Sequence, residues 1–70
     1  MTFQETVVAQ VAAVLTKNKN GYLVYFQAGK MRLSAAPADA RRVSAMLLKE
    51  YDSKVSFKRV DNEFVYEFTQ

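Results

Sequence analysis

Apolar and polar residues alternate between Lys54 and Thr69, on both sides of Asp61-Asn62. A period of two is typical of strands that bury one face, and such a polar pair between two alternating runs indicates a two-residue β-hairpin. The pattern predicts strands over residues 54–60 and 63–69. The face directed to the core would hold Val55, Phe57, Phe64, Tyr66 and Phe68, with Arg59 as an exception near the turn.

Apolar residues follow a different period near the start of the chain. Thr2 with Glu5 three residues later matches a capping box, and an apolar stripe at helical spacing follows it. The pattern predicts a helix over residues 3–17, with Val7, Val8, Val11, Val14 and Leu15 on the stripe. The opposite side carries alanines that suit a solvent face and that also allow a second helix to approach closely: Ala9, Ala12 and Ala13.

A turn is expected at residues 18–21, where Asn-Lys-Asn-Gly tolerates positive φ, and the next segment is rich in β-forming residues. It predicts strands near residues 22–28 and 30–35, joined at Ala28-Gly29. One face would hold Tyr22, Val24, Phe26, Met31 and Leu33 and belong to the core. The other would hold Leu23, Tyr25, Gln27, Lys30 and Arg32.

A second helix is predicted over residues 37–51, since Pro37 suits the first turn and Asp39 places negative charge at the positive end of the helix dipole. Its buried stripe would consist of Ala40, Val43, Ser44, Leu47 and Tyr51, with Leu48 at the margin. Its far side would carry Arg42, Ala45 and Lys49, with Met46 near them.

The elements therefore follow the order α-β-β-α-β-β. Each helix has one apolar stripe and each hairpin one apolar face, so the sequence predicts an α+β two-layer sandwich with both helices packed on one face of a four-stranded antiparallel sheet. Seventy residues fit a single domain spanning residues 1–70. The pattern leaves the order of the strands open.

Composition favours a folded domain, since 50% of the residues are hydrophobic and 24% are charged. The absence of cysteine is compatible with a reducing compartment, and cytoplasmic localisation is the expectation. The first residues do not resemble a signal peptide, and no apolar run approaches the roughly 18 residues of a membrane span, so no membrane association is expected.

Catalytic chemistry has little support in the residue types. The chain has neither histidine nor cysteine, and its carboxylates fall at predicted helix ends, at a turn or on outer strand positions. The two glycines, Gly21 and Gly29, stand alone in predicted turns and form no phosphate-binding loop. We therefore expect no enzyme activity, no cofactor and no metal site.

The remaining candidate is the sheet face turned away from the helices. Several apolar residues fall in its phase, and charged residues surround them, as in many protein interfaces. The sequence predicts a small regulator or inhibitor of the accessory or phage type that binds a protein partner, using Leu23, Tyr25, Lys30, Arg32, Lys58 and Val65. A homodimer through this face is a related possibility, and isolated surface hydrophobes that bind nothing are the plainer interpretation.

A nucleic-acid-binding module is the alternative, because the net charge is +3 and four basic residues project from the same face beside Tyr25: Lys30, Arg32, Lys54 and Lys58. Single-strand binders usually display several aromatic residues for base stacking, whereas here only Tyr25 points outward, and Glu63 and Glu67 offset part of the charge. A secondary basic surface is expected on the second helix, at Arg41, Arg42 and Lys49.

Overall fold

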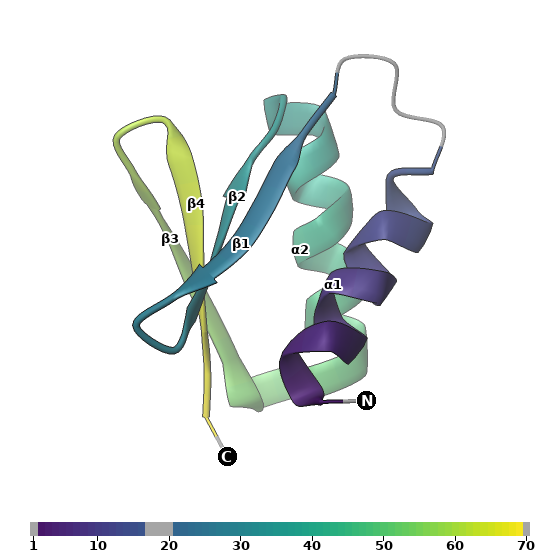
Figure 1. Ribbon diagram of the computed structural model, residues 1–70, viewed down its shortest axis with the longest axis vertical. Helices are drawn as coiled ribbons and strands as arrows, with labels where there is room; N and C mark the ends of the chain where they lie inside the picture. Colours follow the sequence, from purple (N-terminus) through teal and green to yellow (C-terminus); the bar gives the residue numbers. More distant parts are fainter. Residues whose placement is uncertain (1, 17–20, 70) are drawn as a thin grey trace.

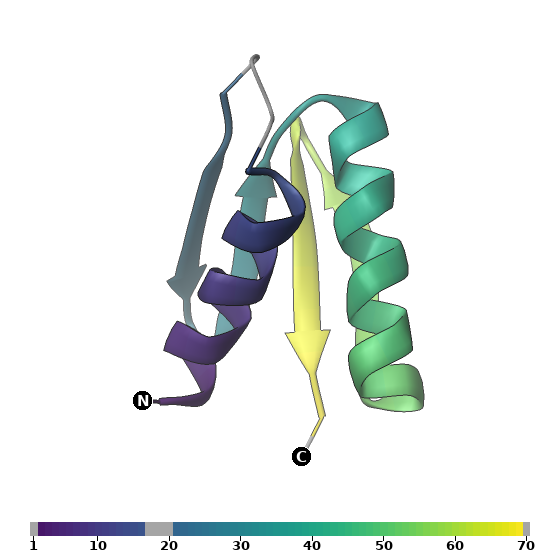
Figure 2. The ribbon, with the colours of Figure 1, turned by 90° about the vertical axis from the view of Figure 1, so that its right-hand side faces the viewer.

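Two helices lie side by side on one face of a four-stranded antiparallel sheet (Figures 1 and 2). The computed structural model describes residues 2–16 and 21–69. The elements are α1 (Phe3–Val14), β1 (Leu23–Gln27), β2 (Lys30–Ser34), α2 (Pro37–Tyr51), the 3-10 turn η1 (Asp52–Lys54), β3 (Val55–Val60) and β4 (Glu63–Phe68). The predicted α+β sandwich and its order of elements are confirmed.

The strand order, which the sequence pattern left open, is β1-β2-β4-β3. Each hairpin contributes its second strand to the centre, where β2 and β4 pair with Arg32 opposite Val65. The outermost strands are therefore β1 and β3. We call the sheet face against the helices the inner face and the opposite one the outer face.

Both predicted hairpins have two-residue loops. Gln27 pairs with Lys30 across Ala28-Gly29, and Val60 pairs with Glu63. Ala28 and Gly29 have φ values of 53° and 78°, the combination that a type I′ turn requires. The strands end within one residue of their predicted bounds.

The predicted capping box is present at the start of α1. The Glu5 N–H donates to Thr2 Oγ1 at 3.1 Å, and Glu5 Oε1 accepts from the Thr2 N–H at 3.0 Å. The backbone hydrogen bond from Thr2, together with its side-chain bond, lowers the pKa of Glu5. The helix ends at Val14, earlier than predicted, while residue 17 and the predicted turn residues 18–20 lie outside the described part of the chain.

The core lies between the helices and the inner face. Its buried members are Val7, Val11, Leu15, Met31, Leu33, Ala40, Val43, Leu47, Val55 and Tyr66. An aromatic cluster closes one end, because Phe3, Tyr51 and Phe68 pack edge to face with ring centroids 5.3–5.6 Å apart. This cluster joins the start of α1, the end of α2 and the end of β4.

Three expectations about the core were wrong. Phe57 points to the inner face as predicted but is 46% exposed, because β3 is an edge strand. Tyr22 precedes β1 and is exposed. Met46 was expected near the outer side of α2 but is half-buried against the core.

Candidate functional site

The six predicted partner-binding residues share the outer face. The cross-strand pairs Tyr25–Arg32, Arg32–Val65 and Lys58–Val65 place residues from all four strands in one row across the middle of this face. Leu23 and Lys30 belong to the same face at the flanks of that row. Leu23 is 59% exposed, the largest exposure among the bulky hydrophobic residues in the described chain.

Glu63 organises this face by holding two side chains from other strands. Tyr25 Oη donates to Glu63 Oε2 at 2.7 Å, and Arg32 Nη1 donates to Glu63 Oε1 at 3.2 Å. Glu63 reaches both because it precedes Val65 by two residues and is therefore a diagonal neighbour of Arg32. The hydrogen bond to Glu63 raises the pKa of the Tyr25 phenol.

We call this arrangement the Tyr25–Glu63–Arg32 triad. From the sequence, Glu63 is expected among the charged residues around the apolar centre of this face and as a charge that offsets nearby lysines. Its central role depends on β2 pairing with β4, which the strand pattern alone does not show. With that pairing known, the diagonal placement of Glu63 beside Arg32 follows.

Val65 lies on the predicted face, but its expected exposure was wrong, since it is only 4% exposed. It stands on a central strand with Arg32 and Lys58 directly opposite on either side. The aliphatic stems of such long side chains cover apolar neighbours while their charged ends reach water. Val65 therefore forms the floor of the face, within a shallow hollow of about 250 Å³ that is also lined by Ser56, Phe57, Lys58 and Glu67.

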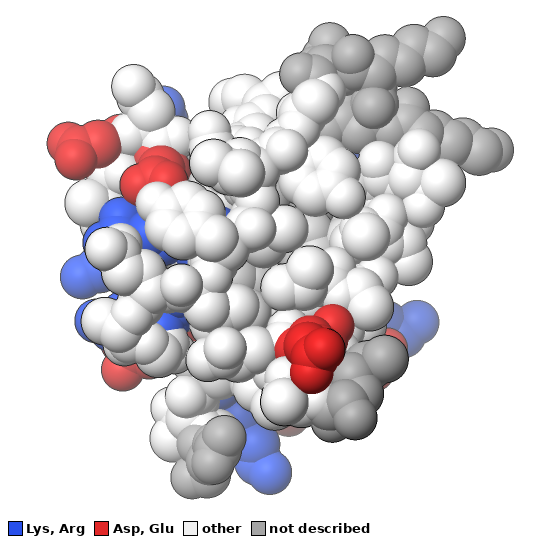
Figure 3. Space-filling model, in the orientation of Figure 1, with Lys and Arg blue, Asp and Glu red and all other residues white. Residues whose placement is uncertain are grey.

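Ion pairs neutralise part of the positive charge on the outer face. Lys30 Nζ lies 3.4 Å from Glu67 Oε2, and Arg32 is paired with Glu63. Acidic and basic side chains lie close together on the side of the molecule formed by β3 and β4 (Figure 3). Of the four cations expected to contact phosphates, Lys54 and Lys58 form no ion pair within residues 2–16 and 21–69.

The secondary basic surface predicted at Arg41, Arg42 and Lys49 also has less free positive charge than expected. Arg41 and Lys49 are exposed on α2 as predicted. Arg42 instead donates from Nη2 to the Val14 carbonyl at 3.0 Å and lies 3.9 Å from Asp39. Because the last carbonyls of a helix lack intrahelical partners, the Arg42 guanidinium stabilises the end of α1.

The described residues contain no group of three or more acidic, histidine or cysteine side chains that could hold an ion. None of the helices in this part of the chain is long and apolar enough to cross a membrane.

Comparisons with known proteins add no assignment to this geometry. No protein-family model, curated protein or solved structure matches the chain.

Proposed function

We propose that the chain is a non-catalytic protein-binding module that occupies the surface of a partner protein through its outer sheet face. The observation that carries this proposal is the Tyr25–Glu63–Arg32 triad, in which one half-buried carboxylate fixes two large side chains at the centre of an open face. Tyrosine and arginine are among the residues that contribute most to binding at protein interfaces.

The triad lowers the entropic cost of association. Ordering a free, rotamer-rich side chain on binding costs about 0.5–1.5 kcal/mol. Tyr25 and Arg32 already have one preferred arrangement in the unbound chain, because both donate to Glu63. Leu23 adds exposed apolar area beside them, and Lys30 and Lys58 contribute charge at the rim.

The nucleic-acid alternative is weakened by the same contacts. Phosphate binding draws its free energy from cations that release counterions. Lys30 and Arg32 already have carboxylate partners, so a phosphate would have to compete with Glu67 and Glu63. Tyr25 is the one aromatic residue in the row across the outer face, whereas single-strand binders usually display several for base stacking.

A small regulator or inhibitor fits this proposal. A 70-residue chain with a modest core can act by covering a partner's surface, as many accessory and phage proteins do. The absence of cysteine supports cytoplasmic localisation as part of the same proposal.

The test begins with affinity capture from the cells in which the chain is expressed. The captured protein is then purified, and its binding is measured by calorimetry. The double variant Tyr25→Ala/Arg32→Ala is expected to abolish binding with little change in thermal stability. Glu63→Ala, which leaves both anchors present but unrestrained, should weaken binding by a smaller factor.

The matched control is Arg41→Ala/Lys49→Ala, which alters the exposed basic surface of α2. We expect this variant to bind like the wild-type chain. Unaltered affinity in the Tyr25→Ala/Arg32→Ala variant, with a loss in the control, would move the site to α2 and refute the proposal for the outer face.

A further inference from the structure

The two edges of the sheet differ in charge. The β3 edge carries Lys58 and Arg59, and Lys54 precedes it directly. The β1 edge has the sequence Leu-Val-Tyr-Phe-Gln, with no charged residue and no proline. Proteins usually protect an exposed edge strand from pairing by charge, proline, a bulge or a covering element. Charge protects β3, whereas β1 carries neither a charged residue nor a proline to prevent another strand from adding to it.

The backbone groups available at this edge follow from the hairpin. A two-residue loop is flanked by a hydrogen-bonded pair, here Gln27 and Lys30, and hydrogen-bonded pairs alternate with non-bonded ones along an antiparallel ladder. Val24 and Phe26 therefore direct their N–H and C=O groups away from β2. No strand of the described chain lies beyond β1 to receive them.

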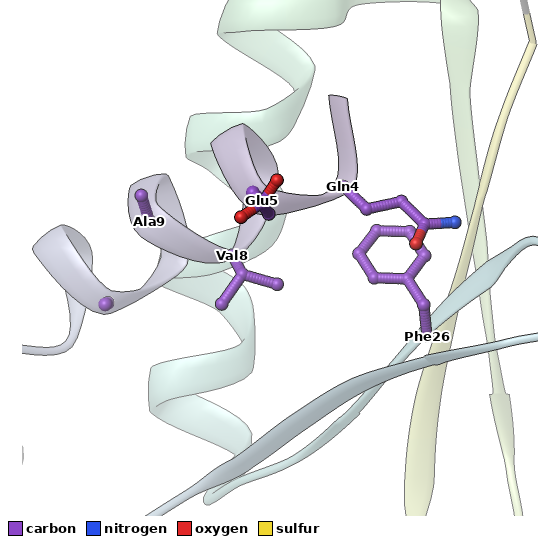
Figure 4. Close-up of a pocket in the computed structure, with 6 residues that line it drawn as sticks. Gln4, Glu5, Val8, Ala9 and Phe26 are labelled. Carbon is purple, nitrogen blue, oxygen red and sulfur yellow. The ribbon is translucent and has the colours of Figure 1, made fainter. Parts of the chain in front are cut away.

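An apolar groove runs beside this edge, between α1 and β1. It has a volume of about 420 Å³ and is lined by Gln4, Glu5, Val8, Ala9, Ala12 and Phe26. Figure 4 shows Val8 and Phe26 approaching each other across the gap between α1 and β1. The surface above α1 and β1 is almost free of charged side chains in Figure 3, and Glu5 is the only charged residue of α1.

Helix α1 is apolar on more sides than the core requires. Val7 and Val11 face the core, but Ala9 and Ala13 are exposed on the far side. Small side chains let a second helix approach within the usual 8–10 Å between axes.

From these features we infer that a second copy of this chain binds at β1 and α1. The two β1 strands would pair antiparallel about a two-fold axis and join the sheets into one of eight strands, with the two α1 helices packed side by side. The inference does not depend on the outer face binding a partner, since that face remains open in the dimer.

The charge distribution favours a second copy at this edge. The surface formed by α1 and β1 carries one charged side chain, Glu5, whose carboxylate already accepts from the Thr2 N–H. The rest of this surface is uncharged and can be complementary to itself, as a two-fold interface requires. The chain carries a net charge of +3, and Lys54, Lys58 and Arg59 lie at the opposite edge. Pairing through β1 keeps these cations of the two copies apart, whereas pairing through β3 would bring them together.

The layer geometry agrees with this arrangement. Helix α1 covers the β1–β2 half of the sheet, while α2 covers the β4–β3 half (Figure 2). In such a dimer, the axis of a helix centred over two strands would lie about two strand spacings, or ~9.6 Å, from the axis of its two-fold mate. That separation is within the range at which helices pack directly.

The first measurement is the mass of the full chain by sedimentation and light scattering over a range of concentrations. We expect twice the chain mass of 8.0 kDa as concentration rises. Ala9→Lys places a charge in the groove and should weaken dimerisation at least tenfold. The control Ala45→Lys makes the same change on the exposed side of α2 and should leave the dimer unchanged. Lysine is nearly as good a helix former as alanine, and circular dichroism verifies that both variants fold.

Amide hydrogen exchange gives a second measurement that needs no variant. In the dimer the Val24 and Phe26 amides should be protected, while those of Phe57 and Arg59, which occupy the equivalent positions on the β3 edge, should exchange rapidly. Ala9→Lys should remove the protection at β1 only. A monomer at concentrations up to about 1 mM, a dimer insensitive to Ala9→Lys, or protection at β3 in place of β1 would each overturn the inference.

Discussion

The hydroxyl groups of Ser44 and Tyr66 lie 2.7 Å apart inside the core and share a hydrogen bond between α2 and β4. Tyr66 also approaches the Ala40 carbonyl at 3.4 Å. Tyr66 is fully buried and Ser44 nearly so, which makes this the one hydrogen bond between two side chains at the centre of the apolar core of the described chain. It fixes α2 over the central strand whose outer side carries Glu63 and Val65.

A double-mutant cycle should show that this bond couples the two residues. Ser44→Ala and Tyr66→Phe each leave one buried hydroxyl poorly satisfied and should destabilise the fold by about 1–2 kcal/mol. The double variant should cost less than the sum, by about 1 kcal/mol, because it removes both hydroxyl groups together. Urea unfolding of the four proteins measures the coupling. Strict additivity would show that the two hydroxyls do not depend on each other.

Stability should fall at alkaline pH because of Tyr66. Burial raises the pKa of its phenol above the ordinary value of 10.0, although the hydrogen bond with Ser44 opposes part of that effect. The folded state therefore retains this proton at a pH where the unfolded chain has lost it. The contribution is fully present below about pH 10 and is lost as pH rises through the folded-state pKa.

Thermal melting between pH 8 and 11 tests this expectation. The wild-type chain should lose stability more steeply above pH 10 than Tyr66→Phe, which cannot ionise at this position. Ser44→Ala serves as the control that keeps the phenol. Identical alkaline profiles for the wild type and Tyr66→Phe would mean that Tyr66 does not contribute to the pH dependence.

Two apolar side chains that the sequence pattern assigns to the core should differ in their contribution. Leu47 is fully buried, so Leu47→Ala should cost about 3–4 kcal/mol, within the range for buried leucines. Phe57→Ala would cost about 3–5 kcal/mol if the ring were buried, but with 46% exposure we expect about 2 kcal/mol. Denaturant unfolding ranks the two variants. A larger loss for Phe57→Ala would mean that the β3 edge is covered in solution.

Nucleic-acid binding should be weak and nearly insensitive to sequence. Four phosphate contacts by Lys30, Arg32, Lys54 and Lys58 would give a slope of log affinity against log salt near −3. Because Lys30 and Arg32 are paired with carboxylates, we expect a shallower slope and dissociation constants weaker than about 10⁻⁶ M at physiological salt. Titration of short single- and double-stranded oligonucleotides at two salt concentrations measures both quantities. Submicromolar, sequence-selective binding would favour the nucleic-acid function instead.

The local pattern determined most of the fold. Three local signals each correspond to an element of the structure: the alternation around Asp61-Asn62, the Thr2–Glu5 capping box and Pro37 at a helix start. Each of these signals involves residues that are close together in the sequence. The predicted end of α1 was less accurate than the predicted start. Val14 ends this helix in the structure, and its carbonyl is bound by Arg42, a residue far along the chain that no local pattern connects to it.

The candidate site could be predicted only in part. The period of two correctly places Tyr25, Arg32 and Val65 on one face. It does not show which strands are central, and strand position determines whether an outward residue is exposed or covered. For this reason neither the burial of Val65 nor the role of Glu63 could be predicted without knowledge of the β2–β4 pairing.

The central claim is that the outer face binds a protein partner, and amide chemical-shift mapping tests it most directly. The isotope-labelled chain is titrated with the purified partner from the capture experiment. We predict the largest changes at Leu23, Tyr25, Arg32, Lys58 and Glu63, with little change at Arg41 and Lys49 on α2. Changes concentrated on α2, with the outer-face amides unmoved, would contradict the account.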